Sequence, residues 1–138
     1  LKKVLSASNI LLINDSESTM LTGEKNINAA ASSLLSLGPE IVVIKKGSNG
    51  AELFSNKEHL RIGAFPVEQV IDPTGAGDVF AGAFTACLSA GQTSQSALLN
   101  ASAMASICIE SFGTERVQSA SNDEIRERVD FLSKTVKS

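Results

Sequence analysis

The segment from Asp72 to Asp78 reads Asp-Pro-Thr-Gly-Ala-Gly-Asp and stands directly before an apolar helical pattern. Gly75 and Gly77 allow the backbone to adopt positive φ and to approach a ligand without an intervening Cβ. The N–H groups of a helix's first turn have no partner within the helix, and the helix dipole adds partial positive charge there. Together these features predict an anion site, above all one for a phosphate group.

Asp78 is the residue of this segment that needs its own explanation. A carboxylate beside a phosphate pocket repels the phosphate, so it weakens binding unless it has a separate role. As a structural residue, Asp78 would cap the helix or stabilise its first turn, which contributes about 1 kcal/mol. As a functional residue, it would be a general base that accepts the proton of a hydroxyl group attacking a phosphorus atom. Residue types alone leave both interpretations open.

The first fifty residues predict a β-α-β unit that precedes this segment. Residues 10–13 and 41–44 are short, continuous apolar runs, which is typical of strands buried on both faces in a parallel sheet. Apolar residues between them indicate a helix, which Gly38-Pro39 ends: Ala29, Ala30, Leu34, Leu35 and Leu37. This order favours parallel strands joined by a right-handed crossover.

The rest of the chain predicts a short meander followed by helices. Residues 51–54 and 60–62 have the pattern of short strands, and the turn signal Gly47-Ser48-Asn49-Gly50 precedes them. The expected helices cover roughly residues 78–90, 94–111 and 122–134, with Ser121 or Asn122 as the cap of the last. With no internal repeat, linker or low-complexity tract, the chain is expected to be one α/β domain or part of one.

The bulk composition is that of an ordinary globular protein. The chain has 138 residues, 43% of them hydrophobic and 20% charged, which fits one compact domain. The formal net charge of -3 gives no basic field for nucleic acid or an anionic membrane. No apolar run approaches the roughly 20 residues that cross a bilayer, and no signal segment opens the chain. We therefore expect a cytoplasmic protein whose partners include neither nucleic acid nor a membrane.

Cysteine and histidine content narrows the chemistry further. Cys87 and Cys108 lie in apolar, Ala-rich stretches and are expected to be buried thiols of a reducing compartment. The single histidine, His59, argues against a His-based triad or a multi-His zinc site. It stands in a charged stretch, so we expect it to be a solvated loop residue.

The segment from Asp72 to Asp78, continued by residues 79–84, resembles the second signature of the ribokinase-like (PfkB) carbohydrate kinases, with no departure from that pattern. The resemblance implies a three-layer α/β/α fold with a mostly parallel sheet, and transfer of the ATP γ-phosphoryl group to a sugar hydroxyl. The backbone of Gly75, Ala76 and Gly77 would form the anion hole for the γ-phosphate, and Asp78 would be the catalytic base.

Two segments nearer the N-terminus agree with this resemblance in order and spacing. Asn14-Asp15-Ser16-Glu17 is similar to the family's Asn-x-x-Glu motif, in which the Glu acts on Mg²⁺ through water and the Asn lies near the phosphates. On residue types alone, Asn14 and Glu17 would be a helix start with an acidic first turn. Lys45 and Gly47 fall in a segment similar to the family's segment beside the nucleotide, which implies that Lys45 contacts a phosphate. The alternative is that Lys45 and Lys46 are a solvated pair of lysines. Lys46 is expected to be a surface residue.

Weaker correspondences lie towards the C-terminus. Asn100 and the turn ending in Gly113 fall at positions where the family surrounds the adenine. The alternatives are that Asn100 is an amide on the surface of a helix and that Gly113 only ends a helix. Many relatives also bind K⁺ behind the anion hole, through the positions that match Asp72 and Thr74. Asp72 is therefore a candidate K⁺ ligand, and Thr74 is a candidate for the nucleotide site as well.

The resemblance covers all 138 residues and corresponds to the C-terminal, nucleotide-binding half of the family's kinase domain. The N-terminal strands, the lid, the first glycine-rich signature and nearly all sugar contacts have no counterpart here, and the chain begins with Leu1. We expect this chain alone not to phosphorylate a substrate. A homodimer would form through the lid, which this chain does not contain.

Three readings of the function remain to be separated. The first is a sugar kinase; the second is a nucleoside or vitamin kinase of the same superfamily, because the acceptor contacts are absent. The third is a catalytically idle nucleotide-binding or assembly module, against which the joint presence of Asp78, Glu17 and the glycines argues. Neither the Walker A pattern nor Gly-x-Gly-x-x-Gly occurs, so P-loop and Rossmann dinucleotide sites lack their motifs.

Overall fold

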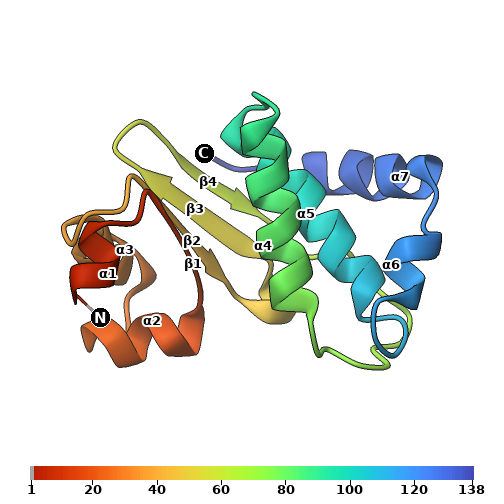
Figure 1. Cartoon of the computed structure of the whole chain (residues 1–138), viewed down its shortest axis with the longest axis horizontal. Coiled ribbons are helices and arrows are strands. Elements are labelled where there is room, and N and C mark those ends of the chain that lie inside the picture. Colours follow the sequence, from red (N-terminus) through yellow and green to blue (C-terminus); the bar gives the residue numbers. More distant parts are fainter. Residues whose placement is uncertain (1) are drawn as a thin grey trace. The chain divides into compact units, whose positions relative to one another are not determined.

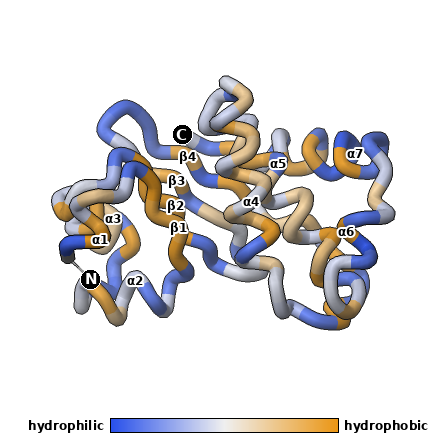
Figure 2. The backbone as a smooth tube through the Cα atoms, viewed as in Figure 1, coloured by the Kyte–Doolittle hydropathy of each residue, from blue (hydrophilic) through white to orange (hydrophobic). Residues whose placement is uncertain are grey.

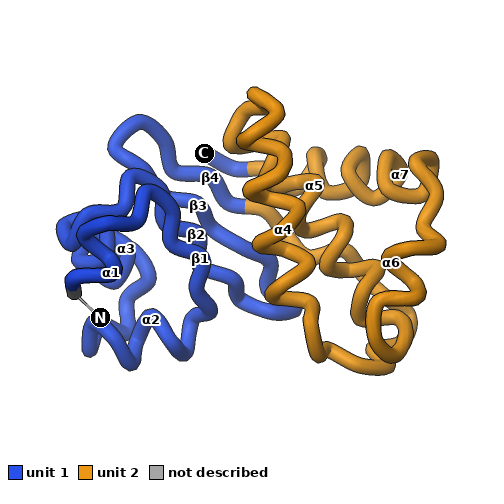
Figure 3. The backbone as a smooth tube through the Cα atoms, viewed as in Figure 1, with its two compact units in different colours: residues 1–61, 137–138 blue, residues 62–136 orange. Residues whose placement is uncertain are grey.

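The computed structural model describes residues 2–138, which form the helices and strands labelled in Figure 1. In chain order they are α1 (Lys2–Ser6), β1 (Ile10–Asn14), α2 (Asp15–Thr22), α3 (Ile27–Leu35), β2 (Ile41–Lys45), a 3-10 turn (Gly47–Asn49), β3 (Ala51–Ser55), β4 (His59–Ile62), α4 (Ala76–Ser89), α5 (Ser94–Cys108), α6 (Glu115–Ser119) and α7 (Asn122–Ser133). They divide into two compact units, residues up to 61 with 137–138, and residues 62–136 (Figure 3).

The first unit is built on a sheet with the strand order β1-β2-β3-β4. β1 and β2 are parallel, with Ile13 opposite Ile44 and Asn14 opposite Lys45. β2 and β3 are antiparallel, and the backbone of Arg61 in β4 also pairs with Lys137. The predicted β-α-β unit, the meander and the α/β class are confirmed, and the described sheet is mixed, because only its first pair of strands is parallel.

The core of this unit lies between the sheet and α3. It consists of side chains that are less than a tenth exposed: Ile13, Ala31, Leu34, Val42, Ile44 and Phe54. β2 is apolar at four consecutive positions, and the hydropathy-coloured tube of Figure 2 shows this run beside β1. Because both faces of such a strand avoid water, the continuous apolar pattern, rather than an alternating one, identified it in the sequence.

Two expectations for the first unit are wrong, because a buried carboxylate needs partners. Glu52 in β3 is 4% exposed. Its Oε1 accepts a hydrogen bond from Lys46 Nζ at 2.6 Å, and its Oε2 lies 2.8 Å from His59 Nε2. His59 also stacks on Phe54, with ring centroids 4.2 Å apart. Lys46 and His59 are therefore half-buried partners of Glu52, and neither is the solvated residue that its local sequence suggested.

The second unit is helical, and α5 packs against α4, α6 and α7. Its largest completely buried side chains come from three of these helices: Phe84, Leu98, Ile107 and Leu132. Three helices match the expected ones, although α4 begins two residues earlier and α5 ends three residues earlier than expected. Both cysteines are free thiols, and Cys108 is buried whereas Cys87 is half-buried. Among residues 2–138, no helix combines the length and hydropathy needed to cross a membrane.

Candidate functional site

The segment that precedes α4 is held by the C-terminal end of α5. The N–H groups of Ile71 and Asp72 both donate to the carbonyl oxygen of Ile109, at 2.8 and 3.3 Å. Next along the segment, the carbonyl oxygen of Thr74 accepts a hydrogen bond from the Cys108 thiol at 3.9 Å. The end of one helix thus fixes the chain that enters the glycine-rich turn.

Asp72 and Thr74 form a local turn within this segment. The Thr74 N–H donates to Asp72 Oδ1 at 2.9 Å, as in an Asx turn. Hydrogen bonds from the Thr74 hydroxyl and N–H hold the pKa of the Asp72 carboxyl below its ordinary value. Burial raises the pKa of the Cys108 thiol, and the negative charge of Asp72 raises it further. Asp72 is therefore an ionised carboxylate, the form that a cation requires.

α4 begins at Ala76 without a side chain to cap it. Its N-cap residue, Gly75, has φ 83° and ψ -11°, a left-handed conformation that glycine adopts without strain. The other described helices of eight or more residues each begin with a side-chain cap: Asn14 for α2, Asn26 for α3, Thr93 for α5 and Ser121 for α7. The first turn of α4 therefore presents backbone N–H groups that no capping side chain occupies.

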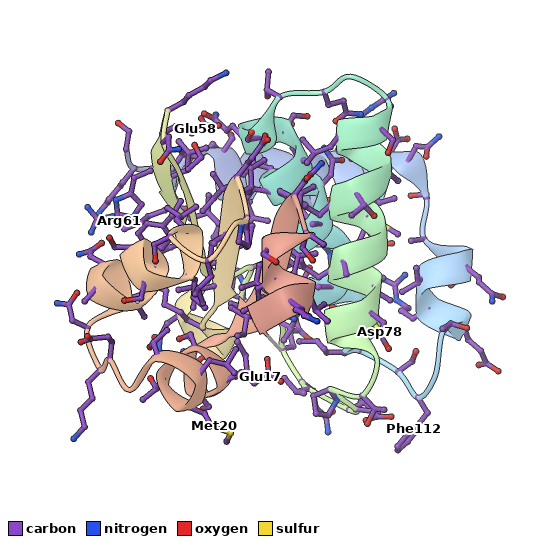
Figure 4. The ribbon with its side chains drawn as sticks, turned by 60° about the vertical axis from the view of Figure 1, so that its left-hand side comes forward. Glu17, Met20, Glu58, Arg61, Asp78 and Phe112 are labelled. Carbon is purple, nitrogen blue, oxygen red and sulfur yellow. The ribbon has the colours of Figure 1, made fainter. Side chains whose placement is uncertain are left out.

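Asp78 is the acidic residue in this first turn, and it is exposed. Figure 4 labels it near the start of α4. The N-cap position belongs to Gly75, so of the two structural roles considered for Asp78 the structure shows the acidic residue of the first turn and not the cap. Its exposed carboxylate thus shares the first turn of α4 with the N–H groups that no side chain caps.

In the first unit, Asn14 and Glu17 form a reciprocal capping box at the end of β1. The Asn14 Oδ1 accepts a hydrogen bond from the Glu17 N–H at 2.7 Å, and Glu17 Oε2 accepts one from the Asn14 N–H at 3.0 Å. This structural role is the one that the residue types alone predicted. A carboxylate has about four lone-pair sites, so Glu17, which is exposed, retains acceptor capacity for water.

Lys45 lies beside this capping box, at the end of the neighbouring strand. It is the register partner of Asn14 across the parallel pair β1 and β2. Gly47 follows with φ 56° and opens the 3-10 turn. The carboxyl ends of two parallel strands thus bring Asn14, Glu17 and Lys45 to one edge of the sheet, as the sequence order required. The side-chain oxygens of Asn14 and Glu17 are the type of ligand that Mg²⁺ prefers.

Asn100 and Gly113, in the second unit, have different surroundings. The side-chain amide of Asn100 donates to the Ser96 carbonyl oxygen, one turn earlier in α5, at 2.9 Å. Gly113 has φ 65° in the turn after α5, and the preceding Phe112 is 73% exposed and points outward (Figure 4). The structure thus gives the Asn100 amide a hydrogen bond within its own helix, and it leaves the turn at Gly113 exposed.

Sequence reasoning missed the support behind the glycine-rich turn. Ile109 and Cys108 act through a carbonyl oxygen and a thiol, and no local motif marks either group. Among the described residues, no cluster of three or more His, Cys, Asp or Glu side chains could hold a metal ion. The expected site residues divide between the two units. Asn14, Glu17, Lys45 and Gly47 belong to the first, and Asp72–Asp78, Asn100 and Gly113 belong to the second.

The comparisons with known proteins agree on one family. Residues 1–120 match the model of the pfkB family carbohydrate kinases. A ribokinase of Arabidopsis thaliana is 34% identical over 114 residues, which cover 78% of this chain and 30% of the relative. A cytidine kinase of Thermococcus kodakarensis is 35% identical over 94 residues, covering 67% of this chain and 34% of the relative. The chain thus spans about a third of the length of these relatives.

Solved structures resemble the fold over nearly the whole chain. The structure of Arabidopsis thaliana ribokinase complexed with ribose and ATP superposes with a TM-score of 0.81 and 29% identity, covering 95% of this chain and 44% of that one. A candidate ribokinase II of E. coli in complex with ATP and Mg²⁺ superposes with a TM-score of 0.81 and 30% identity, covering 94% of this chain and 42% of that one.

Proposed function

The chain belongs to the pfkB family of carbohydrate kinases, and from this premise we propose that it carries the ATP site and the catalytic base of a kinase that phosphorylates a sugar hydroxyl. Because the chain spans less than half of its relatives, the proposal assigns residues 1–138 to the C-terminal, nucleotide-binding half of the kinase domain. Acceptor binding is then supplied by sequence that this chain does not contain.

The observation that carries the proposal is the uncapped start of α4. Gly75 turns the chain into the helix in a left-handed conformation, and no side chain competes for the N–H groups of the first turn. These groups and the helix dipole favour a phosphate group. In phosphoryl transfer, negative charge on the transferred group must be stabilised in place, so the N–H donors at Gly75, Ala76 and Gly77 would act as the anion hole. Without a ligand the Ala76 N–H donates to the Pro73 carbonyl oxygen at 3.3 Å, and it would exchange this long bond for the phosphate.

Asp78 would supply the proton transfer. Its carboxylate accepts the proton of the acceptor hydroxyl as that oxygen bonds to the γ-phosphorus, and the bond from phosphorus to the bridging oxygen of ADP breaks. The repulsion between a carboxylate and a phosphate is then explained, because the carboxylate serves the nucleophile and not the anion. A positioned base of this kind accelerates a reaction by about 10²–10⁴-fold.

Asn14, Glu17 and Lys45 would serve the metal and the phosphates. Bound Mg²⁺ would neutralise charge on the phosphate oxygens. Glu17 would hold it through water with the acceptor capacity left over from the capping box, and Lys45 would contact a phosphate as a point charge. The ionised Asp72 and the oxygens of Thr74 would fit K⁺, and the turn at Gly113 would border the nucleotide.

A specific test uses two matched aspartates. Asp78→Asn removes the base, and Asp123→Asn changes another exposed aspartate in the first turn of a helix, α7. In the whole protein, Asp78→Asn is expected to lower kcat about 10²–10⁴-fold while the Kd for Mg·ATP is unchanged or lower. Asp123→Asn is expected to change neither. Equal turnover by both variants would contradict the role of Asp78, and it is the result that an idle nucleotide-binding module predicts.

A nucleoside kinase is the second candidate, because the cytidine kinase is as similar to this chain as the ribokinase is. The two candidates share the phosphoryl-transfer site and differ in the acceptor. Comparing kcat/KM for ribose, fructose and cytidine in the whole protein separates them. A sugar kinase requires a higher value for one of the sugars, whereas a preference for cytidine assigns the nucleoside reaction.

A further inference from the structure

Arg128 of α7 is a buried cation that contacts Ser106 in the last turn of α5 and Glu110, two residues beyond the end of that helix. It is 6% exposed, and its guanidinium lies 4.6 Å from the centre of the Phe65 ring. Nη1 donates to the Ser106 hydroxyl at 2.9 Å, and Nη2 donates to the two carboxylate oxygens of Glu110 at 2.8 and 2.9 Å. A charge this far from water is retained only where its hydrogen bonds are satisfied, so these contacts are tightly specified.

Acidic and basic neighbours complete a network around this guanidinium. Nη2 of Arg128 also donates to Glu124 Oε1 at 3.1 Å. Arg116 of α6 pairs with the Glu124 carboxylate and lies 3.4 Å from Glu110 Oε2. The hydrogen bond from Arg116 holds the pKa of Glu124 below its ordinary value. Two arginines and two glutamates therefore join α6 and α7 to the end of α5.

This network attaches to the C-terminal end of α5, where one backbone hydrogen bond is long. The Ile109 N–H donates to the Ala105 carbonyl oxygen at 3.4 Å, beyond the usual 2.7–3.2 Å range, and the Glu110 N–H donates to Ile107 at 3.2 Å. Arg128 binds Ser106 and Glu110, which lie immediately before and after residues 107–109 in the chain. Positive charge at this place also favours the C-terminal end of the helix dipole.

The same turn supports the segment that enters α4. The Ile109 carbonyl oxygen, next in the chain to Glu110, accepts the hydrogen bonds from Ile71 and Asp72. A chain of contacts thus runs from the Arg128 guanidinium to Glu110, along the backbone to Ile109, and from there to the turn that begins at Asp72.

We propose that Arg128, acting through Glu110, is a positioning residue that fixes the glycine-rich turn Asp72–Gly75 at the start of α4. The catalytic part of this inference rests on the proposed function, whereas the mechanical link does not. Arg128 makes no hydrogen bond to the turn itself. It sets the position of the Ile109 carbonyl oxygen, which accepts the hydrogen bonds from Ile71 and Asp72. Because a shift of about 1 Å in a phosphate-binding group lowers turnover by up to about 10²-fold, the link also affects catalysis.

The test is hydrogen exchange measured amide by amide on the chain of residues 1–138. Arg128→Met keeps the length of the side chain and removes its charge and hydrogen bonds, and Glu110→Gln weakens the same link from its other end. The control is Arg126→Met, because Arg126 lies on the same helix and its side chain is 77% exposed. Amides in the middle of α5, around Ala101, report on global unfolding.

In Arg128→Met, the exchange of the Ile71 and Asp72 amides is expected to accelerate at least about tenfold more than that of the α5 amides, since a hydrogen bond to a charged group is lost. Arg128→Lys is expected to give a smaller effect, because an ammonium cannot bind Ser106 and Glu110 together. Arg126→Met is expected to change neither set. If Arg128→Met does not fold, Glu110→Gln carries the same comparison.

Equal acceleration of all amides, or none, would overturn the positioning role and leave Arg128 as a structural residue only. In the whole protein, Arg128→Met is expected to lower kcat about tenfold with an unchanged KM for the acceptor, whereas partial unfolding alone would leave kcat per active site unchanged. The two proposals fail separately. A whole protein without kinase activity would refute the proposed function, and the exchange comparison would still decide the link from Arg128 to Ile71 and Asp72.

Discussion

Replacing Gly75 and Gly82 by alanine, one at a time, tests the description of α4 because the two substitutions should change stability in opposite directions. Both glycines belong to the start or the body of the same helix, and a Cβ built on either meets no atom within 4 Å. Neither alanine therefore clashes with a neighbour. What distinguishes the positions is the backbone, because Gly75 has φ 83° and Gly82 is an ordinary helical residue.

The expected magnitudes follow from this difference. A non-glycine residue in the left-handed region costs about 1–2 kcal/mol, so Gly75→Ala is expected to lower the free energy of unfolding by about 1 kcal/mol or more. Glycine inside a helix is less stable than alanine by about 0.5–1 kcal/mol, so Gly82→Ala is expected to raise the free energy of unfolding by that amount. The two variants should therefore differ by roughly 2 kcal/mol.

Urea unfolding followed by far-UV circular dichroism measures both values on the same chain. The comparison requires an unchanged slope of the free energy against urea concentration, since a changed slope indicates a different denatured state or loss of two-state unfolding. Gly75→Ala as stable as the original chain would refute the left-handed start of α4. A destabilising Gly82→Ala would show that this face of the helix is covered, contrary to the open space found around it.

Three further predictions concern other parts of the chain. Glu17→Gln should leave stability nearly unchanged, because glutamine also completes a capping box. The same substitution should raise the Mg²⁺ concentration needed for half-maximal ATP binding, and an equal Mg²⁺ dependence in both proteins would show that Glu17 is not part of the metal site. Burial opposes ionisation of Glu52, but the hydrogen bonds from Lys46 and His59 outweigh burial and lower the pKa of this carboxyl. The stability that Glu52 contributes is therefore present above its ordinary pKa of 4.5 and is lost as the pH falls through the lower pKa of the folded protein. Glu52→Gln should remove this acid dependence from denaturation curves measured between about pH 5 and 3. In native protein a thiol reagent should label Cys87 well before the buried Cys108, whose pKa is raised, and equal labelling rates followed by mass spectrometry would contradict that burial.

The elements of the first unit could be predicted because their signals are local. Residues 10–13 and 41–44 are continuous apolar runs, and Asn14 with Glu17 has the spacing of a capping box. Once the two strands are parallel and in register, Asn14 and Lys45 must share an edge of the sheet. The order of elements thus predicted the strands and the helix start, whereas the resemblance to the family was needed to mark Asn14, Glu17 and Lys45 as site residues.

The Glu52 network could not be predicted, because it depends on how β3 and β4 pair. His59 lies seven residues from Glu52, and its neighbours in the sequence are polar, as in a solvated loop. Only the antiparallel arrangement brings the imidazole to the carboxylate. The preference of a buried charge for partners then overrides the local pattern.

The start of α4 shows a different limit of sequence reasoning. One reading of the sequence made Asp78 the N-cap or a first-turn residue, yet the helix begins at Ala76 after a glycine that has no side chain to cap it, and Asp78 lies in the first turn. Rules for helix starts describe helices whose first N–H groups are satisfied by a side-chain cap, and this helix has none; among its first residues, the Ala76 N–H donates to the Pro73 carbonyl oxygen. The departure from the usual rule coincides with the residues that the family resemblance marks as the anion hole.

The most direct test of the central assignment is calorimetric titration of the chain with Mg·ATP, comparing the original sequence with Gly77→Val and Gly82→Ala. Gly77→Val places a branched side chain at the anion hole, and Gly82→Ala changes the same helix away from it; circular dichroism confirms that all three chains are folded. We expect saturable binding by the original chain and by Gly82→Ala, and a loss of affinity of at least about tenfold in Gly77→Val. Equal binding by all three folded chains, or binding by none, would contradict an ATP site at the start of α4.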